Sequence, residues 1–173
     1  MTTAHDLIRL LKLEPLPEEG GFFRRTWTSV KSWGKDTAGE SLPGASAIHY
    51  LLTVDSYSAI HRLDHEELYF FHAGDPAEIY HFEDSGGISR HVLGHRVDQG
   101  ETLQHRVPAG VWQASRLVPG KPRFGYTLLS TVMCPGFTWA SFQLGRQKTM
   151  LATHPEHRKL VLALSAAEEN PPA

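Results

Sequence analysis

The chain has 173 residues, a formal net charge of −2 and a sequence pI of about 6.6. This length fits one domain with a substantial buried core, so we expect a single domain over residues 1–173. The charge provides no basic field for nucleic acid or for an anionic membrane. We therefore expect a small molecule as the ligand or substrate, with no nucleic acid and no membrane as partners.

The only cysteine, Cys134, cannot form an intramolecular disulfide, which suits a reducing compartment. It ends an apolar stretch, residues 128–134, so we expect a thiol packed in the core. The longest apolar runs fall well short of the ~20 residues of a membrane span. His5, Asp6 and Arg9 are not typical of a signal peptide, and we expect a cytoplasmic protein.

The first residues predict one short amphipathic helix, because four apolar side chains recur at helical spacing: Leu7, Ile8, Leu10 and Leu11. Pro15, Pro17 and the pair Gly20-Gly21 then break the helix. We divide the chain into an N-terminal helix and loop (1–20), a β-barrel (21–145) and a C-terminal segment and tail (146–173). In that last part we expect a helix or strand over 160–164 and disorder over 168–173.

From residue 22 onward the pattern favours β-structure. Phe22–Ser29 alternates bulky and polar residues, which predicts a strand, and Ser32–Gly44 predicts an exposed loop. Further short segments bounded by turn residues predict strands: Ser46–Thr53, Tyr57–Leu63, Glu67–His72, Ala77–Phe82, Ile88–Leu93, Thr102–Val107, Val111–Leu117, Arg123–Met133 and Phe137–Leu144. So many short strands predict an all-β sandwich or barrel behind a short N-terminal helix.

The segment from His61 to Glu67 is the main candidate for chemistry. In a strand, residues two apart share a face, so His61 lies with Leu63, and beyond the turn Glu67 lies with Tyr69 and Phe71. An aromatic face with one His and one Glu is typical of a ligand pocket. A buried carboxylate needs a partner. His61 could be that partner, or His61 and Glu67 could together bind a metal.

Two hairpins of this chain resemble the signature motifs of the cupin superfamily. The first is His61-Arg-Leu-Asp-His-Glu-Glu67 followed by Gly74, and the second is Gly100 followed by Pro108-Ala-Gly110-Val-Trp-Gln113. With Pro17-Glu-Glu-Gly-Gly-Phe-Phe-Arg-Arg25 added, residues 7–144 are similar to the fifth cupin domain family. The resemblance implies a cupin-like double-stranded β-helix (jelly roll) and a homodimer formed by barrel edges. The activity of that family is unknown.

The resemblance also shows where this chain departs from the cupin metal site. In that pattern two His, one Glu and a third His bind Fe, Mn, Zn or Ni. His61 and Glu67 occupy the first and third positions, but Leu63 and Gln113 occupy the others. Leu63 has no lone pair, and an amide oxygen is a weak ligand for such metals. A divalent transition metal is therefore an alternative and not a requirement.

Three functions that use the pocket remain open, beside a fourth interpretation in which the pocket is vestigial and the barrel serves only in assembly. The first is a metal-independent isomerase or epimerase on a small polar or sugar-like substrate, with His61 as base, Glu67 orienting it and Tyr69 as acid. The second is a non-catalytic cupin that binds or senses a small ligand. The third is a metal-dependent enzyme that uses His61 and Glu67. The further side chains expected to bind the ligand are His49, Gln104, Gln113, Tyr126 and Arg24.

The remaining histidines carry different expectations. We expect solvated side chains at His5, His91, His95, His154 and His157, and structural ones at His72 and His81. His65 lies at a hairpin tip. His49 and His105 can face either way, because a register change of one residue reverses both.

Overall fold

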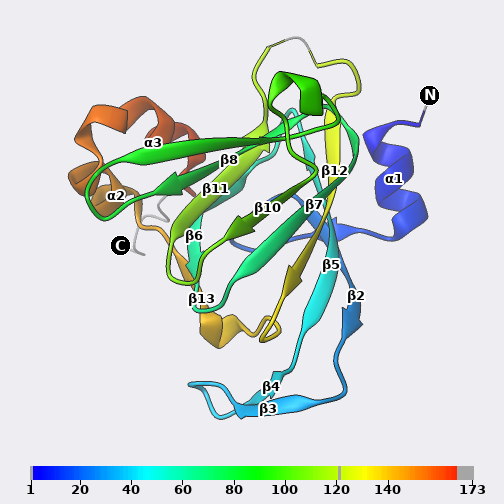
Figure 1. Ribbon diagram of the computed structural model, residues 1–173, viewed down its shortest axis with the longest axis vertical. Coiled ribbons are helices and arrows are strands. Elements are labelled where there is room, and N and C mark those ends of the chain that lie inside the picture. Colours follow the sequence, from blue (N-terminus) through cyan, green and yellow to red (C-terminus); the bar gives the residue numbers. More distant parts are fainter. Residues whose placement is uncertain (1, 121, 167–173) are drawn as a thin grey trace, which may run out of the picture.

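The computed structural model describes residues 2–120 and 122–166 (Figure 1). These residues form a six-stranded and a five-stranded antiparallel sheet that face each other, with a two-stranded arm and short helices at both ends. The predicted all-β fold with a short N-terminal helix is thus confirmed. The predicted disorder at 168–173 lies outside the described residues.

The larger sheet has the strand order β1-β2-β5-β12-β7-β10. Its strands are β1 (Glu14–Pro15), β2 (Phe22–Thr28), β5 (Ser46–Thr53), β12 (Tyr126–Met133), β7 (Glu67–Gly74) and β10 (Gln104–Val107). The smaller sheet has the order β13-β6-β11-β8-β9. Its strands are β13 (Phe142–Leu144), β6 (Ser58–Leu63), β11 (Trp112–Leu117), β8 (Ala77–Phe82) and β9 (Ile88–Leu93). From β5 to β8, and again from β9 to β13, consecutive strands alternate between the two sheets.

Helix α1 (Ala4–Leu11) begins at a capping box, in which the Thr3 hydroxyl accepts from the Asp6 N–H and the Asp6 carboxylate accepts from the Thr3 N–H. Its apolar side packs on the outer face of the six-stranded sheet, over Leu51 and Tyr126. No helix in residues 2–120 and 122–166 has the length and apolar character needed to cross a membrane.

The C-terminal helices cover the outer face of the five-stranded sheet. They are α2 (Gln147–Thr153) and α3 (Arg158–Leu164), joined by the 3₁₀ turn η3 (Pro155–His157). Met150, Val161 and Leu164 are buried there against Ile60 and Phe82. Residues 160–164, for which the sequence allowed either a helix or a strand, are therefore helical.

Three local expectations are corrected. The expected loop at 32–44 is a hairpin, β3 (Ser32–Lys35) and β4 (Ser41–Pro43), which projects as an arm at the bottom of Figure 1. Its turn is held by Asp36, whose carboxylate accepts from two backbone N–H groups. Cys134 is exposed, because β12 ends at Met133 and the chain then leaves the sheet. His154 is buried and its Nε2 lies 2.9 Å from the carbonyl oxygen of Glu83.

Alternation along the strands creates the interior. In β5, Tyr50 and Leu52 point between the sheets while Leu51 lies under α1. The apolar core between the sheets consists of Tyr50, Leu52, Tyr69, Phe71, Ile79, Leu93, Val107, Leu117 and Leu129. Next to this core the interior becomes polar, and that region holds the candidate site.

Candidate functional site

Strand register places polar side chains from both sheets at one level of the interior. On the five-stranded sheet, Gln113 of β11 lies opposite His61 of β6 on one side and opposite His81 of β8 on the other. On the six-stranded sheet, Tyr69 of β7 lies opposite His105 of β10. We call these five side chains the polar layer. The first and second cupin-like motifs, far apart in the sequence, meet here.

A buried hydrogen-bond relay joins the two sheets. The Tyr69 hydroxyl donates to Oε1 of Gln113 (3.1 Å), and Nε2 of Gln113 donates to Oε2 of Glu67 (2.9 Å). All three side chains are buried, and burial holds the pKa of Tyr69 well above its usual value. Tyr69 therefore keeps its proton and acts as a donor. Gln113 uses both ends of its amide, so we call it the bridge of the relay.

Glu67 is a buried carboxyl group with a raised pKa. Burial raises its pKa, and the nearby charge of Glu19 raises it further. His61 and the hydrogen bonds from Thr131 and Gln113 act in the opposite direction and do not cancel the rise. Such a carboxyl group can hold a proton closer to neutral pH than an exposed glutamate can.

Glu19 is the site residue that sequence reasoning missed. It lies in the loop after α1, where its Oε1 accepts from the Ser58 hydroxyl (2.7 Å) and its carbonyl oxygen accepts from the Ala59 N–H (2.7 Å). Gly20 permits this approach: it has φ +97°, and a Cβ there would lie 2.5 Å from the carbonyl oxygen of Tyr57. The motif Pro17-Glu-Glu-Gly-Gly21 carried the signal, but we used it as a helix break and as part of the family resemblance, and expected no site residue in it.

His61 lies behind Glu19. Its Nδ1 lies 2.8 Å from the carbonyl oxygen of Ala59, which makes Nδ1 the donor and leaves Nε2 facing Glu19 at 4.0 Å from Oε2. The imidazole is 1% exposed and stacks on Phe142 with a ring separation of 5.3 Å. His61 is therefore shielded from solvent and has Glu19 as its neighbouring carboxylate.

Glu19 and Glu67 both border a cavity of about 530 Å³ between the sheets. This volume suits a small molecule. Tyr50 and Thr131 add hydroxyl groups to the wall, and Arg25 lies at its edge. The apolar part of the wall is formed by Leu16, Phe23, Ile48, Leu63, Met133, Phe137 and Trp139.

The five predicted ligand-binding residues are all outside the lining of this cavity, with Gln113 engaged in the relay and the other four directed elsewhere. Ile48 and Tyr50 line it, so His49 between them points to the outer face of the sheet, where its Nδ1 lies 3.4 Å from the Ser130 hydroxyl. Arg24 pairs with His49 across β2 and β5 and lies on that same outer face. The other two are Tyr126, which packs under α1, and Gln104, which is exposed.

The residues at the cupin metal position do not fit a transition metal. Leu63 lines the cavity without a donor atom, and both amide atoms of Gln113 are engaged in the relay. His61 has its free nitrogen directed at Glu19. Within residues 2–120 and 122–166, a set of three or more His, Cys, Asp or Glu side chains spaced for a metal occurs only at His81, His91 and His105. We therefore derive no chemistry from a metal at His61 and Glu67.

Comparisons with solved structures support the arrangement. A protein from Shewanella oneidensis, SO0799, has a TM-score of 0.86 and 33% identity, covering 97% of this chain and all of that one. A hypothetical protein from Leishmania major has a TM-score of 0.85 and 28% identity, covering 95% of this chain and 99% of that one. Oxalate decarboxylase from Bacillus subtilis shares the fold alone, with a TM-score of 0.53, 12% identity and coverage of 93% of this chain and 39% of that one.

Sequence comparisons agree. The uncharacterized protein YML079W of Saccharomyces cerevisiae is 28% identical over 160 residues, which is 87% of this chain and 76% of the yeast protein. The family model described as "Cupin superfamily (DUF985)" matches residues 5–145. Both the resemblance noted in the sequence and the jelly-roll fold are thus confirmed. The chain belongs to this cupin family.

Proposed function

We propose that this cupin-type small-molecule-pocket protein is a metal-independent isomerase or epimerase that moves a proton on a small polar substrate. The observation that carries the proposal is the pair of interacting carboxyl groups, Glu19 and Glu67, at the wall of one largely apolar cavity. A carboxylate accepts a proton and a carboxylic acid donates one, so a pair held in different protonation states supplies both functions.

Glu67 is the proposed acid. Its raised pKa favours the protonated form, and Gln113 fixes one of its oxygens. Glu19 is the proposed base, since Ser58 holds its Oε1 while Oε2 lies beside His61. Glu19 would take a proton from an acidic C–H of the substrate, and Glu67 would return a proton to the resulting carbanion. The substrate gains and loses one proton, and no oxidant is needed.

His61 acts through Glu19 in this scheme. The sequence led us to expect the imidazole itself as the base, but the cavity wall among the described residues includes Glu19 and not His61. We therefore assign His61 a positioning role, in which it accepts the proton that Glu19 collects. Tyr69 likewise acts through Gln113 and does not reach the cavity wall.

The wall restricts the substrate. The aromatic rings of Phe23, Phe137 and Trp139 can pack against the C–H face of a sugar ring, while Arg25 can bind a negatively charged oxygen at the edge. A sugar-like molecule with an acidic C–H group next to a carbonyl fits these features.

The test is proton exchange in heavy water. The protein is incubated with sugar-like carbonyl compounds, and loss of the C–H signal is followed by NMR. We expect Glu67→Gln to lower the exchange rate ~10²–10⁴-fold, while Glu66→Gln, at the exposed neighbouring residue, leaves it unchanged. His61→Gln should shift the pH profile of exchange. Exchange that is as fast in Glu67→Gln as in the wild type overturns the proposal.

A non-catalytic binding protein is the second candidate. The observation that favours it is the closed relay, in which Glu67 is already hydrogen-bonded to Gln113. It predicts that a compound from the same set perturbs the resonances of residues at the cavity wall and raises the melting temperature without any C–H exchange.

We also infer a homodimer through the edge of β2. β1 pairs with β2 only at Phe22 and Phe23, which leaves the rest of that strand edge open among the described residues, and Trp27 is 52% exposed there. An open edge of this kind needs a cover. Light scattering at micromolar concentration should give twice the chain mass, and Trp27→Glu should give a monomer.

The unpaired Cys134 favours a reducing compartment, so the proposed location is the cytoplasm.

A further inference from the structure

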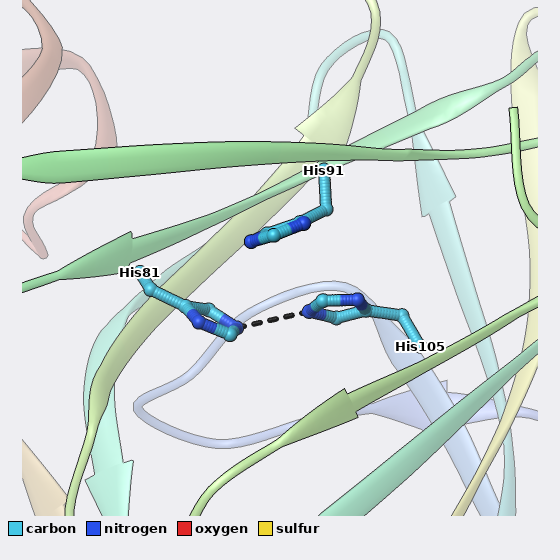
Figure 2. Close-up of side chains that lie close together, drawn as sticks. All are labelled: His81, His91 and His105. Carbon is cyan, nitrogen blue, oxygen red and sulfur yellow. Dashed lines mark hydrogen bonds between the residues drawn. The ribbon is translucent and has the colours of Figure 1, made fainter. Parts of the chain in front are cut away.

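Three histidines from three strands converge at one edge of the interior (Figure 2). His81 lies on β8, His91 on β9 and His105 on β10. Their ring centroids are 4.2 to 4.9 Å apart, and Nε2 of His81 lies 3.0 Å from Nε2 of His105. One ring nitrogen from each lies within 4.8 Å of the others. We call this group the histidine cluster.

The fold explains the convergence. His91 pairs with Ile79 across β8 and β9, and Ile79 and His81 share the inner face of β8, so both histidines point between the sheets. His105 reaches them from β10 at the edge of the opposite sheet. The cluster therefore links the β9 edge of the five-stranded sheet to the β10 edge of the six-stranded sheet. His91 is partly buried and is not the solvated side chain that the sequence predicted.

We propose that the histidine cluster binds a divalent transition metal ion of the zinc, cobalt and nickel class. Three imidazoles with one open position form a ligand set that such ions favour. This site is separate from the cupin metal position at His61 and Glu67, and the proposal does not depend on the proposed catalytic function.

The protonation state supports binding. Burial and the neighbouring rings lower the pKa of His81 and of His105 to about 4, and burial lowers the pKa of His91. Burial thus disfavours the charged form of each ring, and a neutral imidazole offers a lone pair. The His81–His105 hydrogen bond requires one of the two Nε2 atoms to carry a proton. Metal binding at both then needs a change of tautomer with no net loss of a proton.

The spacing is close to that of a bound ion. Zinc–nitrogen bonds of about 2.0–2.1 Å in a tetrahedral site place ligand nitrogens roughly 3.3 Å apart. The His81–His105 pair is already near this value, and the ring nitrogens of the cluster need to close by at most ~1.5 Å. The Ser89 hydroxyl lies 3.2 Å from Nε2 of His91, which would help to orient that ring.

The surroundings leave a fourth position open. His91 and His105 border a cavity of about 450 Å³ that is distinct from the substrate cavity. Its nearest carboxylate, Glu101, is held by the side chain and the backbone N–H of Arg96. A bound ion would therefore take water from this cavity as its fourth ligand. His81 pairs with Gln113 on the neighbouring strand, and His105 pairs with Tyr69 on the neighbouring strand. A bound ion would therefore be held by residues that flank the relay.

The test uses the full chain freed of metal with a chelator. Titration with Co²⁺ should give the visible absorption of a tetrahedral site, saturating at one ion per chain, and Zn²⁺ should displace the Co²⁺. We expect His81→Gln and His105→Gln each to weaken Zn²⁺ binding by at least ~100-fold. His49→Gln, on the outer face, and Cys134→Ser should bind as the wild type does.

A second measurement keeps the proposal falsifiable if the variants fold poorly. Imidazole ¹H–¹⁵N spectra of the wild type should show Zn²⁺-dependent shifts at the three rings of the cluster. Shifts at His61, or loss of binding in His61→Gln with binding retained in His105→Gln, would place the ion at the cupin position and overturn the proposal. An ion bound equally well by the variant lacking all three histidines would overturn it too.

Discussion

The cavity bordered by Glu19 and Glu67 and the histidine cluster are both close to one hydrogen bond, which joins Tyr69 to Gln113. At the cavity wall Glu67 is a buried carboxyl group, whereas the titratable groups of the histidine cluster are imidazoles. Burial disfavours charge in both places, so it raises the pKa of Glu67 and lowers the pKa of His81 and His105.

One physical cause therefore has two chemical consequences. A neutral carboxyl carries a proton that it can give away, whereas a neutral imidazole carries a lone pair that it can share with a metal. The two regions are built from equivalent positions of neighbouring strands, since Gln113 pairs with His61 on one side and His81 on the other. Under the two proposals above, the carboxyl groups near His61 would favour proton transfer, and the two further imidazoles beside His81 would favour metal binding.

The largest expected effect comes from removing the bridge. Gln113→Leu keeps a similar volume but leaves the Tyr69 hydroxyl and one oxygen of Glu67 without their partner. Two unsatisfied buried groups should cost about 2–4 kcal/mol of unfolding free energy, measured by urea denaturation at pH 7. The matched control is Gln143→Leu, which removes an exposed amide bound to Arg62 and should change stability by under ~0.5 kcal/mol. Equal losses in the two variants would mean that Gln113 does not couple the regions.

The sequence predicted one region better than the other. Period-two alternation grouped His61 with Leu63 and Glu67 with Tyr69, and the aromatic character of that face indicated a pocket. The structure brings His61 and Glu67 together with Gln113 and Tyr69. These residues belong to the two cupin-like motifs, whose turn residues indicate where each strand begins and so set the register of the strands. Glu19 was missed because it lies in a loop, where no periodicity indicates the direction of a side chain.

Errors elsewhere have a common cause. His49 and Tyr126 were assigned to the ligand, yet both point outward, because alternation fixes which residues share a face and not which face is inside. The histidine cluster was missed for a related reason. Its members lie on β8, β9 and β10, and their convergence depends on the pairing of β8 with β9 and on the approach of β10 from the other sheet. Neither can be deduced from one strand alone.

A smaller effect should appear on the histidine side at low pH. The pKa of His81 and of His105 is about 4 in the folded chain, below the ordinary value of 6.5. Their contribution to stability is thus complete above pH 6.5 and is lost as the pH falls toward 4. Allowing for partial exposure, the loss should total about 1–3 kcal/mol. Urea denaturation across this range should show a shallower decline for the His81→Gln/His105→Gln double variant, and an unchanged one for His5→Gln. A double variant that declines as steeply as the wild type would show that these rings are not held neutral.

Glu67 should give the smallest effect, with the opposite sign. Because its folded pKa is raised above the ordinary 4.5, wild-type stability falls as the pH rises from 4.5 through the folded value. Glu67→Gln removes this dependence, so its stability relative to the wild type should increase with pH, by about 1.4 kcal/mol for each tenfold difference in proton affinity between the folded and the unfolded chain. Urea denaturation from pH 4.5 to 8 measures the difference, and Glu66→Gln, at an exposed side chain, should show none. The opposite outcome is a stability difference between Glu67→Gln and the wild type that shrinks as the pH rises. It would mean that Glu67 is ionised in the folded chain and that burial does not act alike on the two sides of the relay. The acid of the proposed reaction would then have to be another group.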